Sequence, residues 1–150
     1  MLMVDECMSA WTGQDAVYST SGLPHKTKIK RKPEGVGADI KSVACSTTGV
    51  LLGLDIMEGQ SRQHAKPYWV QYGEGTAFVL RPTEAKKSTG RTVVANSAFA
   101  SVKTLLALKE RGLFFMGIIK TAHRGFPKTI LQKSSNRNES VTFPTILMAR

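Results

Sequence analysis

The chain has 150 residues, of which 41% are hydrophobic and 21% are charged, and its formal net charge is +10. This length suits a single domain with a hydrophobic core, and this composition indicates a globular chain rather than a disordered one. The excess of Lys and Arg favours a polyanionic partner, with nucleic acid ahead of an anionic membrane, because no amphipathic basic helix stands out.

The compartment can be inferred from what the sequence lacks. No apolar run reaches the roughly 18 residues of a membrane span, and the start, "MLMVDECM", lacks the basic flank of a signal peptide. Cys7 and Cys45 form neither a CxxC pair nor a disulfide framework. We therefore expect a soluble intracellular protein, nuclear or cytoplasmic, with no membrane partner.

The first elements are a short strand and a basic segment. Leu2 to Val4 is an apolar run that ends on Asp5 and Glu6 and predicts a first strand, and the residues from Met8 to Thr20 are turn-rich. The segment "KTKIKRK" then repeats lysine at every second position, at Lys26, Lys28, Lys30 and Lys32. If this segment is extended, its ammonium groups share one face at intervals of about 6.6 Å. Such a face suits phosphate groups of DNA, and a nuclear-import signal and a merely solvated surface are the alternatives.

A hairpin is predicted next. The runs "ADIKSVACS" and "VLLGLDIMEG" read as strands joined by the turn "STTG", which ends at Gly49. The second run alternates with a period of two. Residues 59–72 are polar and mixed, and a short helix is expected from Gly75 to Lys87, interrupted by Pro82.

The last predicted elements are a strand, a helix and a strand. Thr92 to Ala95 is a strand that stops at Asn96, and apolar residues at helical spacing follow from Val102 until Gly112 closes the segment. The run "LFFMGII" is apolar throughout, which predicts burial on both faces beside a parallel neighbour. After Lys120 the chain becomes polar and basic.

This order of elements predicts an α/β protein with an incomplete ribonuclease-H-like fold. Its mixed sheet would begin with an antiparallel hairpin and end with a β-α-β crossover. In that arrangement the first strand lies at the centre, beside the strand at 92–95. Asp5 and Asn96 would then face each other across one edge of the sheet.

Three stretches carry a resemblance to a known family: "MVDECM", "GLPHKTKIKRKPEGVGADIKS" and "VVANSAFASVKTLLALKERGLFFMGIIKTAHRGFPKTI". Together they resemble the piggyBac transposase family, whose acidic pair matches Asp5 and Glu6 and whose Lys-Pro step matches Lys32 and Pro33. The family's second acidic signature matches "NSAFASV". The resemblance implies that residues 1–133 are part of the transposase catalytic domain and that residues 134–150 are a polar basic tail.

The sequence departs from the family at its metal site. Family members use three carboxylates to hold two divalent metals, which activate an oxygen nucleophile against a phosphodiester. Asp5 matches the first carboxylate, but Asn96 stands at the second position, and the third is expected downstream of Arg150. An amide oxygen carries no net charge to balance two cations, so Mg²⁺ is expected only in intact family members and this chain is expected to have no cofactor.

These departures lead to a first hypothesis and two alternatives. The first is a truncated, catalytically inactive transposase-derived protein that retains weak, sequence-independent DNA binding or associates with related transposase chains, and that uses no small-molecule cofactor. The second is a working metal-dependent nuclease in which Glu6 or Asp55 replaces the lost ligand. The third is a decayed element relic with no selected role.

Overall fold

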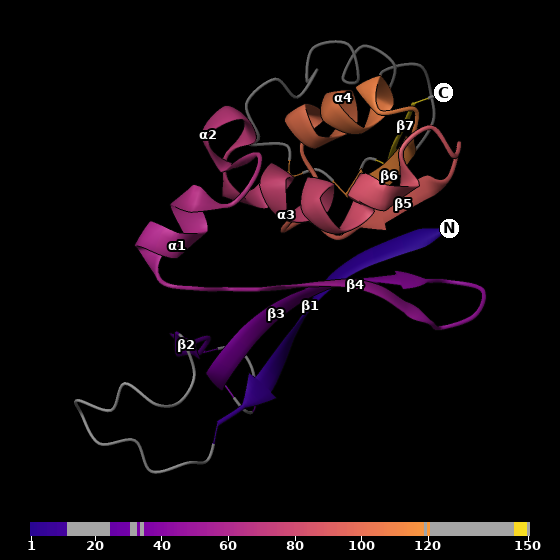
Figure 1. Cartoon of the computed structure of the whole chain (residues 1–150). Helices are drawn as coiled ribbons and strands as arrows, with labels where there is room; N and C mark the ends of the chain where they lie inside the picture. The colour runs from indigo at the N-terminus through magenta and orange to yellow at the C-terminus, as the bar shows by residue number, and fades with distance from the viewer. Residues whose placement is uncertain (12–24, 31–32, 34, 119, 121–145, 150) are drawn as a thin grey trace, which may run out of the picture.

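The computed structural model of the chain describes residues 1–11, 25–30, 33, 35–118, 120 and 146–149 (Figure 1). The strands are β1 (Leu2–Ala10), β2 (Thr27–Lys28), β3 (Val36–Cys45), β4 (Leu51–Ile56), β5 (Thr92–Ala95), β6 (Phe114–Ile118) and β7 (Ile146–Ala149). The helices are α1 (Gln60–Ala65), α2 (Trp69–Tyr72), α3 (Glu74–Thr83), the 3-10 helix η1 (Glu84–Lys86) and α4 (Val102–Glu110).

The described strands form one seven-stranded mixed sheet in the order β2-β3-β1-β5-β6-β7, with β4 also paired to β3. The strand β3 is antiparallel to both β1 and β4, which is the predicted hairpin. The strand β5 runs parallel to β1 and to β6, and α4 connects β5 to β6. The structure therefore confirms the predicted α/β fold, with the first strand at the centre beside the strand at 92–95.

The helices α3 and α4 lie on one side of the sheet, and the core lies between them and the strands (Figure 1). Leu2 on β1, Phe78 on α3, Leu108 on α4 and Phe115 on β6 are all at most 2% exposed. Burying an apolar side chain of this size stabilises the fold by about 1.5–3 kcal/mol. The apolar face of each helix thus holds it against the sheet.

The residues at the ends of the helices and strands suit the local backbone geometry. Ser101 begins α4, and its hydroxyl oxygen accepts a hydrogen bond from the backbone N–H of Thr104 at 3.0 Å. Gly112 follows the end of α4 with φ of 65°, and Gly49 ends the β3–β4 turn with φ of 68°. Glycine adopts this left-handed conformation without steric penalty. Pro82 lies in the last turn of α3, so the helix continues to Thr83 before it tightens into η1.

Several elements differ from the sequence-based expectation. The strand β1 continues through Asp5 and Glu6 to Ala10, because nine residues of β1 pair with β3. Residues 59–72, which the sequence marks only as polar and mixed, contain α1 and α2. The predicted burial of "LFFMGII" on both faces is wrong for the described residues, since Phe114 and Ile118 are 41% and 42% exposed.

The segment expected to be a tail contributes to the sheet. Ile146–Ala149 forms β7, which pairs antiparallel with β6. Residues 134–145 of that expected tail lie outside the described residues.

Candidate functional site

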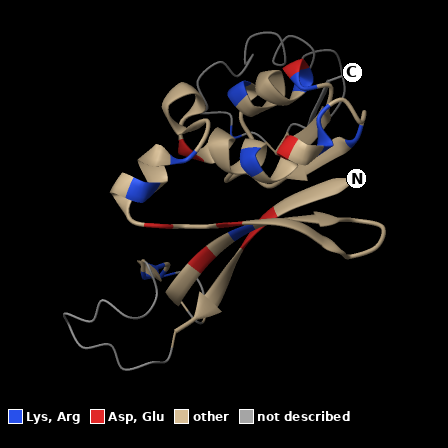
Figure 2. Ribbon diagram, viewed as in Figure 1, with Lys and Arg blue, Asp and Glu red and all other residues tan. Residues whose placement is uncertain are grey.

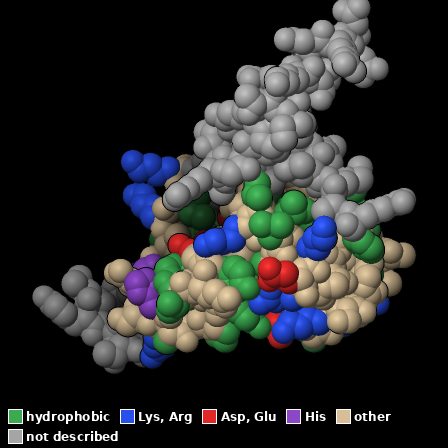
Figure 3. All heavy atoms as spheres, turned by 90° about the horizontal axis from the view of Figure 1, so that it is seen from above, with side chains coloured by type: hydrophobic (Ala, Val, Ile, Leu, Met, Phe, Trp, Pro, Cys, Tyr) green, Lys and Arg blue, Asp and Glu red, His purple; other side chains and the backbone are tan. Residues whose placement is uncertain are grey.

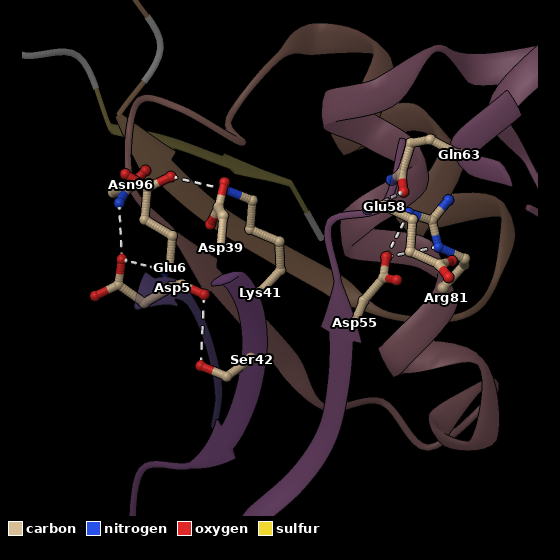
Figure 4. A network of polar contacts seen from close by, with 10 residues as sticks. All are labelled: Asp5, Glu6, Asp39, Lys41, Ser42, Asp55, Glu58, Gln63, Arg81 and Asn96. Atoms are coloured by element: carbon tan, nitrogen blue, oxygen red, sulfur yellow. Dashed lines mark hydrogen bonds and ion pairs between the residues drawn. The ribbon is translucent and has the colours of Figure 1, made fainter. Parts of the chain in front are cut away.

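Two side chains that are far apart in sequence meet beside the central pair of parallel strands. Asp5 follows the last β1 residue that pairs with β5, and Asn96 is the first residue after β5. The amide Nδ2 of Asn96 donates a hydrogen bond to Oδ1 of Asp5 at 3.0 Å (Figure 4). The structure therefore brings together the two residues that the sequence analysis had placed at one sheet edge.

The orientation of the Asn96 amide is fixed by its own turn. Its Oδ1 accepts a hydrogen bond from the backbone N–H of Ala98 at 2.8 Å. Its backbone carbonyl accepts hydrogen bonds from Phe99 and Ala100 at 3.2 and 3.0 Å. Because the amide oxygen bonds to the turn, the amide nitrogen faces Asp5. The group beside Asp5 is thus a hydrogen-bond donor.

The Asp5 carboxylate is exposed and only partly engaged. Its Oδ1 accepts hydrogen bonds from Asn96 and from the backbone N–H of Glu6, the latter at 2.8 Å. No described residue donates a hydrogen bond to Oδ2. One carboxylate oxygen is therefore available to a further partner.

A shallow hollow of about 350 Å³ opens beside this pair. Asp5 and Asn96 lie at its polar side, and Met3, Val94 and Met116 supply apolar walls. These residues come from β1, β5 and β6 and from the positions just after β5. The hollow therefore lies where the parallel strands end, which is the usual place for ligand sites in α/β sheets.

The neighbouring acid, Glu6, points to the opposite face of β1. Successive side chains of a strand alternate between the two faces, and the Glu6 carboxylate accepts a hydrogen bond from Nζ of Lys41 at 3.0 Å. Lys41 also donates to both carboxylate oxygens of Asp39, at 2.9 and 2.8 Å (Figure 4). The three side chains are between 6% and 10% exposed.

This buried ion group shifts the pKa of Lys41. Burial alone would lower the pKa of Lys41, but the hydrogen bonds that Lys41 donates to Asp39 and Glu6 outweigh burial and raise this pKa above 10.5. Phe78 and Phe99 also place their rings 5.6 and 5.5 Å from the ammonium nitrogen. Glu6 is thus held by a buried cation.

Asp55 is held in a second ion group between β4, α1 and α3. Lys66 donates to its Oδ1 at 2.9 Å, and the guanidinium of Arg81 donates to its Oδ2 through both Nε and Nη2 (Figure 4). Lys66 also pairs with Glu58 at 3.1 Å. Neither Asp55 nor Glu6 therefore lies beside Asn96 as a replacement ligand.

The sequence analysis had not found the role of Lys41. A signal was present, because Asp39 and Lys41 are two residues apart in a strand whose other residues, apart from Ser42, are apolar or glycine, and they therefore share one face. A lysine at an inward position of such a strand indicates a buried ion pair.

Comparison with known proteins identifies the family. The family model described as Transposase IS4 matches residues 1–145. The chain belongs to this transposase family. A comparison with curated proteins found no match.

A solved structure shows the same fold in a transposase. This chain is similar to the piggyBac transposase in the cryo-EM structure of its synaptic complex with hairpin DNA, with a TM-score of 0.68 and 20% sequence identity. The match covers 91% of this chain and 26% of the piggyBac transposase chain. The fold expected from the resemblance is confirmed, and the chain spans about a quarter of the length of the protein it matches.

The described residues of this transposase-family chain do not fit a pair of divalent metals. Hard cations need several anionic oxygens close together. At the sheet edge Asp5 supplies one carboxylate, and the amide oxygen of Asn96 is already bonded to Ala98. Within the described ranges, no cluster of three or more His, Cys, Asp or Glu side chains could hold a metal ion.

The lysines of the transposase-family chain are only partly arranged as expected. The extended conformation is found at Thr27–Lys28, which is β2, whereas Lys30 lies in a turn. Lys26, Lys28 and Lys30 are exposed, and Lys32 lies outside the described residues. In Figure 2 the basic residues at and beside β2 lie at the lower left, at the edge of the sheet far from α4. No helix in the described part of the chain is long and apolar enough to cross a membrane.

Proposed function

We propose that this chain is a transposase-fold protein that binds DNA weakly and without sequence preference, and that does not cleave or join DNA strands. One observation carries the second part of this proposal: the Nδ2 group of Asn96 donates to Asp5 where the family has a second metal-binding carboxylate. A donor group beside the carboxylate competes with a cation for the same oxygen.

The hydrogen bonds of the Asn96 amide favour the orientation in which Nδ2 points toward Asp5. If Asn96 turned its oxygen toward a metal, it would lose the bond to the Ala98 N–H and bring Nδ2 to that N–H instead. Two donors would then face each other, which is unfavourable at a site with few other partners. The turn after β5 thus favours the donor orientation of Asn96.

The DNA-binding part of the proposal is supported by charge and by fold. The chain carries a net charge of +10, and three exposed lysines lie at or beside β2. The piggyBac transposase with the same fold was solved in a complex with hairpin DNA. Lysine contacts to phosphates carry no base information, so binding by this means is independent of sequence. Association with related transposase chains also belongs to this proposal.

A cleavage assay tests the proposed lack of catalysis. The purified chain is incubated with end-labelled hairpin DNA and with Mg²⁺ or Mn²⁺, and the products are separated on a denaturing gel. We expect no nicking or strand transfer above the level seen with Asp5→Ala. Metal-dependent nicking by the unmodified chain that is lost in Asp5→Ala would refute the proposal.

A further inference from the structure

The turn after β5 places an asparagine amide next to the backbone N–H of a small residue. Asn96 is exposed, and Ser97, which follows it, is only partly buried. Among the described residues, no group accepts a hydrogen bond from the Ser97 N–H, whereas the N–H groups of residues 98–100 all donate to oxygen atoms of Asn96. The Ser97 nitrogen is therefore not engaged in the hydrogen bonds that hold this turn.

The Asn96 side chain is folded back over the main chain. Its Oδ1 accepts the Ala98 N–H at 2.8 Å, which closes an Asx-type turn around Ser97. Carbon Cγ of Asn96 and the nitrogen of Ser97 both belong to the ring that this hydrogen bond closes. The fold thus holds an electrophilic carbon and a nitrogen on the same side of the chain, which favours a reaction between them.

The groups around the amide favour attack at Cγ. When a nitrogen adds to Cγ, negative charge develops on Oδ1, and the Ala98 N–H at 2.8 Å is a donor placed to stabilise it. The nitrogen that must leave is Nδ2, which is bonded to the carboxylate of Asp5 at 3.0 Å (Figure 4). A neighbouring carboxylate favours the protonated form in which Nδ2 departs.

We propose that Asn96 is a site of spontaneous deamidation, at which the chain converts its own amide into a carboxylate with water as the co-reactant. The Ser97 nitrogen loses its proton and forms a bond to Cγ. The bond between Cγ and Nδ2 breaks, and Nδ2 gains a proton and leaves as ammonia, so that a succinimide ring remains. Water then opens the ring at either carbonyl carbon and gives aspartate or isoaspartate, with no change of oxidation state.

The product changes the contact with Asp5. Aspartate at position 96 loses the hydrogen bond from Nδ2 and places two carboxylates against each other. Isoaspartate also lengthens the main chain between Asn96 and Ser97 and so disturbs the turn. The net charge falls by one from +10 in both cases. We expect the converted chain, separated by ion exchange, to melt at a lower temperature than the intact chain, whether or not the chain binds DNA.

Peptide mapping tests the proposal. The purified chain is incubated in heavy-oxygen water at acidic, neutral and mildly alkaline pH, and is then digested with trypsin. Cleavage after Arg91 and Lys103 releases residues 92–103, in which Asn96 is the only amide side chain. We expect this peptide to gain the mass of a carboxyl group in place of an amide, with one heavy oxygen. The converted fraction should increase with time and with hydroxide concentration, because the attacking nitrogen must lose its proton.

Variants at position 97 test the ring closure. Ser97→Gly removes the side chain that crowds the ring, and Ser97→Val adds a branched one while keeping the N–H. We expect conversion about tenfold faster in Ser97→Gly and about tenfold slower in Ser97→Val. The matched control is Ala98→Val, because Ala98 is exposed and its nitrogen is not the attacking atom. That control is expected to convert within about twofold of the unmodified chain.

A comparison without any substitution tests the contribution of the fold. A synthetic peptide of residues 92–103 has the same local sequence but lacks Asp5 and the folded turn. We expect the folded chain to convert at least as fast as this peptide. If the chain stays intact where the peptide converts, the turn protects Asn96 and the proposal is wrong. Formation of aspartate without isoaspartate, or equal rates in Ser97→Gly and Ser97→Val, would show that no succinimide forms and would equally overturn it.

Discussion

At Asn96 an NH₂ group lies where the resemblance to the piggyBac family implies a carboxylate oxygen, and it donates to Asp5 at 3.0 Å. The size and shape of the side chain are almost unchanged by this difference, but the sign of the interaction with Asp5 is reversed. A carboxylate at this position would repel Asp5 unless a cation lay between them, whereas the amide attracts it directly. The Asn96–Asp5 contact therefore needs no cation between the two side chains.

The variant Asn96→Asp should make the fold dependent on divalent cations. Two carboxylates would then lie within hydrogen-bond distance, so the melting temperature should fall in chelator and rise when millimolar Mn²⁺ is added, by the linkage of ligand binding to stability. Differential scanning fluorimetry measures both. Asn96→Ala is the control, for which we expect no response to Mn²⁺.

Catalysis should not return with Asn96→Asp. The nearest other acid, Glu6, faces the other side of β1 and is bonded to Lys41. Robust cleavage of hairpin DNA by Asn96→Asp would show that another carboxylate completes the metal site, and would contradict this expectation.

Replacing Lys41 should lower the stability of the fold. In Lys41→Met the carboxylates of Asp39 and Glu6 would remain buried without their cation, which should lower the free energy of unfolding by about 3–5 kcal/mol at neutral pH. Urea denaturation measures this loss. Lys109→Met, an exposed change on α4, should stay within about 0.5 kcal/mol of the unmodified chain.

The pH dependence of this effect has a definite sign. The pKa of Lys41 is raised in the folded chain, so its contribution to stability is complete below 10.5 and is lost as the pH rises through the folded value. The stability difference between the unmodified chain and Lys41→Met should therefore stay constant from neutral pH to 10.5 and shrink above that pH. A difference that shrinks between neutral pH and that value would place the stabilising charge on another group.

Among the elements, the strand–helix–strand unit from Thr92 to Ile118 was predictable because its signals are local. A short β-branched strand, an N-cap serine, helical spacing and a closing glycine all lie within that stretch. The β3–β4 hairpin was predictable for the same reason, since Gly49 ends its turn.

The elements that sequence analysis missed depend on contacts distant in the chain. The second half of β1 contains Glu6 and is a strand because it pairs with β3 and because Lys41 neutralises that acid. The short helices α1 and α2 are held by contacts such as the bond from Lys66 to Asp55. The pairing of Asp5 with Asn96 could be predicted from strand order, whereas the orientation of the Asn96 amide could not.

The close packing around Gly117 on β6 leads to a prediction about stability. A Cβ atom on Gly117 would lie 2.9 Å from Cβ of Ala100 and 3.0 Å from the carbonyl oxygen of Ala95, so the turn after β5 packs directly on this glycine. Gly117→Ala should therefore lower the free energy of unfolding by about 1–3 kcal/mol through overpacking.

The control for this change is Gly59→Ala. No atom lies within 4 Å of a Cβ built on Gly59, and its φ of −59° suits alanine. Its stability in urea should equal or slightly exceed that of the unmodified chain. An equal loss for both variants would mean that close packing on β6 does not hold the turn that carries Asn96.

At the scale of the whole molecule, the positive charge is spread over the helix side and is also present at β2. Figure 3 shows Lys and Arg on the helix side interspersed with hydrophobic and acidic side chains. On that side Lys87 pairs with Glu84, whereas Lys28 and Lys30 near β2 are exposed. A phosphate backbone is therefore expected to contact the β2 region first.

The salt dependence of DNA binding tests this expectation. Contacts from Lys26, Lys28, Lys30 and Lys32 to about four phosphates give a slope near −3.6 in a plot of log affinity against log salt. Lys28→Ala with Lys30→Ala should make the slope shallower by about 2. The pair Lys86→Ala with Lys87→Ala is the control, measured by anisotropy on duplex DNA, and equal effects of the two pairs would show that no patch exists at β2.

The central position of β1 also sets an order of events during synthesis. Asp5 and Asn96 are 91 residues apart, so at about 5–20 residues per second the ribosome needs roughly 5–18 s after making Asp5 before its partner exists. Through that interval β1 can pair with β3, but its other edge remains open to any extended chain nearby. A nascent polypeptide of this kind therefore depends on prompt shielding of that edge, for example by a chaperone at the exit tunnel, and slower translation before β5 would be expected to increase aggregation.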